Sequence, residues 1–114
     1  MLHKMKLQPE YYNHIKNGTK RIEIRLNDEK RQKIKKGDII CFQKEPDLCE
    51  SLTTKVVDLV KYDSFKALID DFDISILANE SITKEELLNT LKKYYSEESE
   101  QKYKVLGIKI ELIK

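Results

Sequence analysis

The stretch of residues 18–25, GTKRIEIR, constrains the fold of this chain more than any other segment. Apolar and charged residues alternate along it, and a period of two is typical of a β-strand with one face in the core. The charged face of such a strand would carry Arg21, Glu23 and Arg25. We therefore predict a strand over residues 20–26, with Lys20 at its first position and Gly18 ending the helix before it.

Two interpretations of the charged face remain open at this point. Mixed charges on an exposed strand face often keep a sheet edge soluble, and Arg21, Glu23 and Arg25 would then form weak surface pairs worth less than about 1 kcal/mol each. Alternatively, the same side chains and Lys20 form the floor of a ligand cleft. The alternation alone favours the first interpretation, and the second depends on the rest of the chain.

The length of 114 residues suits one domain, which we predict to span residues 1–114. Because 39% of the residues are apolar and 37% are charged, we expect a small core under a densely charged surface. No apolar run is long enough to span a bilayer, and the first residues lack the apolar stretch of a signal peptide. These features predict a cytoplasmic protein with no membrane partner.

The cysteines and histidines do not predict a metal site. The chain has two cysteines and two histidines, which are Cys41, Cys49, His3 and His14. The distances between them along the sequence do not match the spacings of known metal-binding motifs. We therefore expect neither a metal ion nor another cofactor.

The charges are divided unevenly along the chain. Residues 1–44 contain 12 basic and 5 acidic residues, whereas residues 45–114 contain 10 basic and 15 acidic residues. This asymmetry favours one positive surface for a polyanion, unless the two halves interleave in space so that their fields cancel.

The remaining pattern predicts an α+β fold. Alternating or β-branched runs predict further strands at 4–7, 39–42, 53–62 and 103–112. Helices are predicted at 8–17, at 29–35, after a cap at Asp63, and from the capping box of Thr83 and Glu86 to residue 94 or 95. The polar segment 96–101 is predicted to be a loop. Short returns between the strands favour a small mixed or antiparallel β-barrel surrounded by helices.

Several segments, in order, resemble the ASCH domain of the PUA-like superfamily over nearly the whole chain. They are Gly18-x-Lys20-x-x-Glu23-x-Arg25, Lys36-Gly37-Asp38 before an apolar strand, the strand 56–62 running into Asp63-Ser64-Phe65, the segment Tyr95 to Glu98, and the segment Tyr103 to Ile108. The resemblance implies a PUA-like barrel with a cleft floored by the 18–25 stretch. It also implies binding of RNA or a nucleotide.

As a binding module, the chain would use the 18–25 stretch as its ligand site. Lys20 and Arg25 would contact a phosphate, and Glu23 would orient them or accept a hydrogen bond from a base amine. Tyr103 or Tyr95 would stack on a base, although core packing with a hydrogen-bonded hydroxyl is the favoured interpretation of both tyrosines. The predicted ligand-binding residues are thus Gly18, Lys20, Glu23, Arg25 and Tyr103.

The alternative is a hydrolase, because one branch of the family removes acyl groups from acylated cytidine and another is linked to RNA cleavage. The lysine of the amidohydrolase branch falls on Lys20, and its glutamate falls on Glu80. Its threonine nucleophile falls on Glu23, so the hydroxyl is missing and covalent catalysis is in doubt. An enzyme would therefore use Glu23 or Glu80 as a general base and Lys20 to stabilise an oxyanion.

Overall fold

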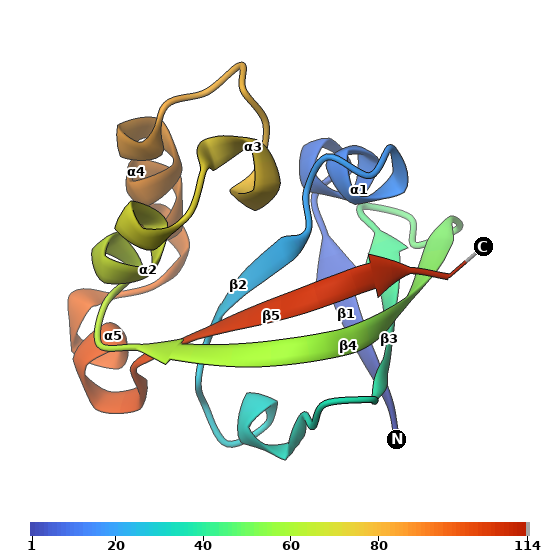
Figure 1. The fold of residues 1–114 in the computed structure, drawn as a ribbon, viewed down its shortest axis with the longest axis horizontal. Helices are drawn as coiled ribbons and strands as arrows, with labels where there is room; N and C mark the ends of the chain where they lie inside the picture. The colour runs from blue at the N-terminus through green and yellow to red at the C-terminus, as the bar shows by residue number, and fades with distance from the viewer. Residues whose placement is uncertain (114) are drawn as a thin grey trace.

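Five strands form one curled sheet in the computed structural model, which describes residues 1–113. The strands are β1 (Leu2–Leu7), β2 (Ile22–Leu26), β3 (Ile39–Lys44), β4 (Ser51–Tyr62) and β5 (Val105–Leu112). They lie in the order β1-β3-β4-β5-β2, in which β1 pairs parallel with β3 and the other pairs are antiparallel. The sheet curls into a half-barrel whose two edges are β1 and β2 (Figure 1).

Five helices and a single 3₁₀ turn accompany the sheet in this part of the chain. They are α1 (Pro9–Lys16), the turn η1 (Arg31–Lys33), α2 (Phe65–Asp71), α3 (Ile74–Leu77), α4 (Lys84–Tyr94) and α5 (Glu97–Tyr103). Helices α2 to α5 gather on one side of the sheet, and α1 lies apart from them (Figure 1). The predicted α+β class is confirmed, and the small mixed β-barrel that was expected is a curled half-barrel with helices around it.

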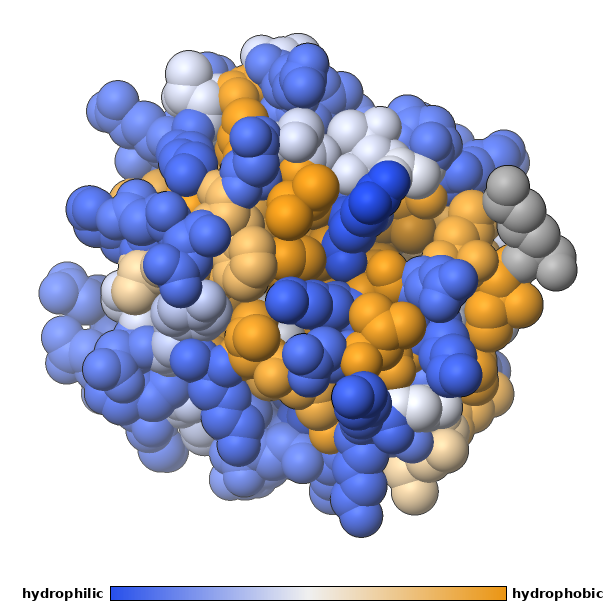
Figure 2. Space-filling view, viewed as in Figure 1, coloured by the Kyte–Doolittle hydropathy of each residue, from blue (hydrophilic) through white to orange (hydrophobic). Residues whose placement is uncertain are grey.

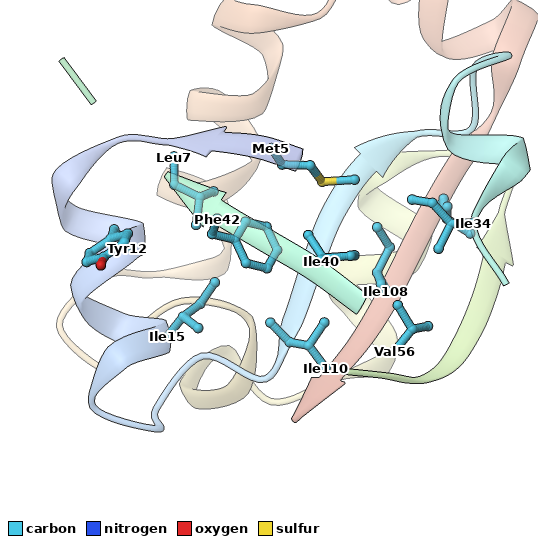
Figure 3. Packing of buried hydrophobic residues seen from close by; sticks show 11 residues of the cluster. Met5, Leu7, Tyr12, Ile15, Ile34, Ile40, Phe42, Val56, Ile108 and Ile110 are labelled. Carbon is cyan, nitrogen blue, oxygen red and sulfur yellow. The ribbon is translucent and has the colours of Figure 1, made fainter. Parts of the chain in front are cut away.

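Strand β5 lies between two hydrophobic cores. Its residues Leu106, Ile108 and Ile110 belong to the inner core, which fills the half-barrel and contacts α1 (Figure 3). Val105, which points the other way, belongs to the outer core beneath α2, α3 and α4. Gly107 lets the outer layer come close, because a Cβ atom there would lie 2.8 Å from Val60 Cγ2 and 3.0 Å from Leu68 Cδ1. Both faces of the strand are therefore buried.

Several local signals in the sequence are confirmed. Pro9 occupies the first turn of α1, where its missing N–H leaves no helical hydrogen bond unmade. Gly18 follows that helix with a φ of 84°, a left-handed conformation that glycine adopts without strain. Thr83 and Glu86 form the predicted capping box at the start of α4.

One predicted loop and one predicted cap were wrong, and one predicted helix is shorter than expected. Residues 96–101 were predicted as a loop but belong mostly to α5, whose N-terminus is capped by the Ser96 side chain and carries acidic residues in its first turn. Ser64, not Asp63, caps α2. The basic helix predicted at 29–35 is only the short turn η1, to which the Asp28 carboxylate contributes by accepting a hydrogen bond from the Arg31 N–H.

The 18–25 stretch also differs from its prediction. The strand begins at Ile22, so Lys20 lies before it in the connection from α1. Of the charged side chains, only Arg21 is exposed, whereas Glu23 is buried and Arg25 is largely covered. The interpretation of an exposed solubility face is therefore wrong for Glu23 and Arg25. Alternation identified two faces of the strand, but both are covered.

The surface seen in Figure 2 is mostly hydrophilic around a central group of apolar side chains. Within residues 1–113, no helix combines the length and the apolar character that a membrane span requires. In the same residues, no three side chains of the kinds His, Cys, Asp and Glu come together where they could hold a metal ion.

Candidate functional site: a buried charge cluster beside a cavity

Glu23 and Arg25 point into the half-barrel from its edge strand β2. In the pairing of β2 with β5, Glu23 lies opposite Ile108 and Arg25 lies opposite Leu106. Directly opposed residues of an antiparallel pair project to the same face, and both β5 partners belong to the inner core. The strand register thus carries two charged side chains into an otherwise apolar interior.

The Glu23 carboxylate joins two cations there. Oε2 accepts from Nε and Nη2 of Arg25 at 3.0 and 2.9 Å, and Oε1 lies 3.4 Å from Nζ of Lys20. Oε1 also accepts from the Ile24 N–H at 3.1 Å. Lys20 and Glu23 are only 4% and 5% exposed, so water contributes little to their solvation. We refer to Lys20, Glu23 and Arg25 as the charge cluster.

Lys20 is held by backbone carbonyls as well as by Glu23. Its Nζ donates to the carbonyl oxygen of Ile22 at 2.6 Å and to that of Leu77, at the end of α3, at 2.7 Å. Burial lowers the pKa of Lys20, and the nearby Glu23 carboxylate opposes this change. Three acceptors match the three donors of an ammonium group, so the geometry fits the charged form.

Arg25 links the two edges of the half-barrel. Besides contacting Glu23, its Nη2 donates to the carbonyl oxygen of Lys6 in β1 at 2.9 Å. The guanidinium therefore spans the gap between β1 and β2, strands that are not hydrogen-bonded neighbours in the sheet. Burial on its own would lower the pKa of Arg25, but the Glu23 carboxylate and the Tyr95 hydroxyl outweigh this effect. The pKa of Arg25 is therefore raised above its ordinary value, and the group stays charged.

The charge cluster has one more positive than negative charge. Burial on its own would raise the pKa of Glu23, but the charges of Arg25 and Lys20 and the hydrogen bonds to the carboxylate hold it below its ordinary value. Two cations thus surround one carboxylate in a water-poor site. An excess charge in such a place favours an anionic group next to it.

A cavity of about 390 Å³ lies beside the charge cluster. It is bordered by β1, β2, α1 and α4, and its walls combine the cluster with aliphatic and aromatic side chains. The further lining residues are Lys6, Leu7, Gln8, Tyr11, Ile24, Glu45, Leu87, Thr90, Leu91, Tyr94 and Tyr95. At its exposed side the amide of Gln8 donates a hydrogen bond to the hydroxyl of Tyr94, which joins the start of α1 to the end of α4.

The structure brings together only some of the residues predicted for the site. Lys20, Glu23 and Arg25 line the cavity together with Tyr95. The other predicted site residues are not among the residues that line it. Gly18 follows α1, Glu80 is exposed before α4, and Tyr103 ends α5 beside the outer core.

Sequence reasoning missed the contribution of α1 and α4 to the cavity wall. The helical spacing of Tyr11 predicts a core residue, and it does pack on the core, but it also lines the cavity. Tyr94 is 58% exposed, and the sequence pattern indicates only that a helix ends near it. The available signal for a binding surface was an aromatic side chain at a helix end. That signal does not say which other segments of the chain would form the opposite wall of the cavity.

The comparison with protein families decides the classification. The model of the ASCH domain family matches residues 5–114. The chain belongs to the ASCH domain family. No curated protein is a significant match to this ASCH chain.

Solved structures agree with that classification. The chain is similar to the hypothetical protein PH0355, with 42% identity, a TM-score of 0.87, and coverage of 99% of this chain and 100% of that one. It is also similar to protein PF0455 from Pyrococcus furiosus, with 34% identity, a TM-score of 0.80, and coverage of 100% and 99%. A serine-to-alanine variant of ZmASCH from Zymomonas mobilis shares the fold, with 13% identity, a TM-score of 0.69, and coverage of 96% and 67%. The half-barrel is thus the PUA-like fold of ASCH proteins.

Proposed function

We propose that this ASCH domain binds RNA or a nucleotide-like ligand in the cleft formed by the charge cluster and the adjoining cavity. The observation that carries the proposal is the buried group of Lys20, Glu23 and Arg25, which has an excess positive charge and lines the cavity. A phosphate or another anion in the cavity would balance that charge. The ASCH family, moreover, is suggested to bind RNA.

The cavity walls suit a nucleoside. Tyr11, Tyr94 and Tyr95 line the cavity, and aromatic side chains are the kind that stack on unpaired bases in RNA-binding proteins. Burial raises the pKa values of Tyr11 and Tyr95, so both hydroxyls stay protonated and can donate hydrogen bonds. A volume of about 390 Å³ is within the usual range of small-ligand pockets.

Glu23 fits the role of a positioning residue in this proposal. Its two oxygens already receive hydrogen bonds or ion pairs from Arg25, Lys20 and the Ile24 N–H, which together use about the four acceptor positions of a carboxylate. We therefore assign it the orientation of the two cations. Acceptance of a hydrogen bond from a base amine is the less favoured role.

The hydrolase alternative has weaker support from the geometry. A carboxylate whose pKa lies below its ordinary value is a poor general base, because it has little affinity for the proton that it must remove. Glu80 is exposed and does not line the cavity. Binding without chemistry is therefore the function that we put to the test.

The test compares two arginines of the same segment. Arg25→Gln removes the cleft guanidinium, and Arg21→Gln removes the exposed guanidinium four residues earlier and has the same effect on net charge. The affinity of short single-stranded RNAs would be measured for both variants and the wild type at several salt concentrations. Because hydrogen bonds to charged groups contribute about 1.5–3 kcal/mol, Arg25→Gln should weaken binding by roughly 10- to 150-fold.

The control and a second assay make the outcome decisive. Arg21→Gln should change affinity only slightly, and circular dichroism should show that both variants remain folded. Equal losses in the two variants, or wild-type affinity that does not respond to salt, would contradict binding in the cleft. Turnover of acylated cytidine or cleavage of the RNA that disappears in Glu23→Gln, while circular dichroism shows that this variant is folded, would instead support the hydrolase.

A further inference from the structure

Glu45 lines the cavity beside the charge cluster, and its carboxylate has no partner in the described part of the chain. Within residues 1–113 this carboxylate takes part in no hydrogen bond and no ion pair, and the neighbouring Lys44 pairs with Glu50 at 3.1 Å instead. Glu45 is partly exposed, so water solvates the carboxylate until a ligand replaces that water. Of the two carboxylates that line the cavity, it is the one with acceptor positions left for a ligand.

The backbone places Glu45 beside the end of β1. Its N–H donates to the carbonyl oxygen of Leu7 at 2.8 Å, directly after the last residue of β3. The carbonyl oxygen of the preceding residue, Lys6, accepts from Nη2 of Arg25 at 2.9 Å. Successive carbonyl groups of a strand point to opposite sides, so Arg25 and Glu45 flank the same end of β1.

Gln8 and Glu45 form the rim where the cavity meets a second hollow. Both residues line both spaces, and the hollow is completed by Glu10 and two prolines. The side-chain amide of Gln8 is bonded to the Tyr94 hydroxyl, which brings that tyrosine to the same rim. A base that stacks on Tyr94 would therefore have its edge near the Glu45 carboxylate.

The charge cluster supplies donors to the same cavity. Glu23 has no acceptor position to spare, because the two neighbouring cations and a backbone N–H occupy its oxygens. The hydrogen bonds of Arg25 to Glu23 and Lys6 use Nε and Nη2, which leaves Nη1 as a donor for a ligand. The cavity thus offers a guanidinium donor on one side of β1 and a carboxylate acceptor on the other.

We propose that Glu45 selects the base of the ligand and favours guanine. This inference rests on the proposed binding of RNA or a nucleotide and states which base is recognised by which residue. A carboxylate accepts two hydrogen bonds side by side, and the Watson–Crick edge of guanine offers two adjacent donors, N1–H and the N2 amino group. The phosphate would then contact Arg25 and the base edge would contact Glu45, which matches the separation of donor and acceptor in the cavity.

The other bases fit this acceptor less well. Adenine and cytosine present one amino group beside a ring nitrogen that accepts, so the second carboxylate oxygen would face a lone pair. Uracil presents a single N–H between two carbonyl oxygens. Guanine therefore gains a charge-assisted hydrogen bond that the other bases cannot form, and a phosphate contact could not supply this difference because it is the same for every base.

The first experiment compares bases at one position of a short RNA. The affinities of UUGUU, UUAUU, UUCUU, UUUUU and UUIUU would be measured with the wild-type chain, where I is inosine, whose base keeps N1–H but lacks the N2 amino group. UUGUU should bind most tightly. Since one hydrogen bond to a charged group is lost in UUIUU, its affinity should be roughly 10- to 150-fold lower than that of UUGUU.

The second experiment replaces the carboxylate. Glu45→Gln keeps the shape but places an amide donor beside a single acceptor, so the affinity for UUGUU should fall roughly 10- to 150-fold and its advantage over UUUUU should disappear. Glu10→Gln is the matched control, because Glu10 lines the hollow but not the cavity and the change in net charge is the same. This control should leave the ratio of the two affinities unchanged, and circular dichroism should show that both variants are folded.

A third variant separates the failure of base selection from the failure of the proposed function. Arg25→Gln should weaken all five pentanucleotides by a similar factor, since a phosphate contact does not distinguish bases. Equal wild-type affinities for the five, or an unchanged ratio of UUGUU to UUUUU in Glu45→Gln, would overturn selection by Glu45 while binding that depends on Arg25 still supported the proposed function. Absence of binding by every pentanucleotide would reject the proposed function and base selection together.

Discussion

Glu23 is the residue that makes two buried cations tolerable in the half-barrel. Its carboxylate contacts Lys20 and Arg25, and both it and Lys20 are almost fully covered. Glu23→Gln keeps the shape and removes the charge, which leaves two cations without a counterion. We expect a loss of about 3–5 kcal/mol in the free energy of unfolding at pH 7, measured by urea denaturation. Glu111→Gln on the exposed part of β5 should change it by less than about 0.5 kcal/mol.

The same carboxylate predicts a pH dependence of stability. The pKa of Glu23 is lower in the folded chain than its ordinary value of 4.5, so between these two pKa values the unfolded chain binds more protons. The free energy of unfolding therefore rises with pH across that window, and the contribution of Glu23 is lost as pH falls through it. We expect the stability difference between the wild type and Glu23→Gln to shrink steadily below pH 4.5, in denaturation series at matched salt. A constant difference down to the acid transition would contradict this account.

The sequence predicted this residue's neighbours but not its environment. The alternation in the 18–25 stretch identified Glu23 and Arg25 as sharing a face with one another, and the register with β5 confirms it. What covers that face depends on the curl of the whole sheet and on α1 and α4. Because those elements lie far away in the chain, no local pattern could reveal that the charges are buried.

At the scale of elements, the contact between α2 and β5 depends on a single missing side chain. Gly107→Ala would place a Cβ atom 2.8 Å from Val60 Cγ2 and 3.0 Å from Leu68 Cδ1, distances at which atoms must move. We expect this substitution to destabilise the fold by about 1–3 kcal/mol through overpacking, as measured by thermal and urea unfolding. Combining it with Leu68→Ala should give a smaller total loss than the sum of the two single losses, since the cavity and the new methyl group compensate.

The elements that the sequence predicted are those with apolar periodicity or a specific end signal. Strands β3, β4 and β5 follow from their β-branched and alternating runs, and α4 follows from its capping box. Helix α5 has no buried residue and therefore no apolar stripe to detect. It is stabilised instead by the Ser96 cap, by acidic residues at its N-terminus, and by Glu100, whose carboxylate accepts from the Phe65 N–H. That last contact spans 35 residues and lies outside any local pattern.

At the scale of the molecule, two cores share one sheet. Ile40 lies in the inner core and Leu68 lies in the outer core, and β5 contributes side chains to both. Loss of either core should therefore unfold the other. Ile40→Ala and Leu68→Ala should each cost about 2–5 kcal/mol while keeping one cooperative transition by both circular dichroism and tyrosine fluorescence. Two separate transitions in either variant would show that the cores fold independently, against the prediction of a single domain.

The cleft also belongs to this largest scale, which limits what the sequence could predict of it. One stretch of eight residues contains Lys20, Glu23 and Arg25, so the members of the charge cluster could be picked out together from the sequence. Tyr11 and Tyr94 come from two other segments and line the same cavity only because α1 and α4 lie beside the half-barrel. A pattern search finds residues that are close along the chain, whereas a cavity wall is assembled from segments that are distant along it.

The hydrogen bond between Gln8 and Tyr94 has a consequence for the rates at which a ligand would bind and dissociate. It joins α1 to α4 at the exposed side of the cavity, so in the proposed binding mode it narrows the entrance that a ligand would use. A narrower entrance slows entry and exit to a similar extent, because both directions pass the same barrier. Gln8→Ala should therefore increase the association and dissociation rate constants together, with little change in their ratio, in stopped-flow measurements with short RNAs. An increase in dissociation alone would mean that Gln8 contacts the ligand directly.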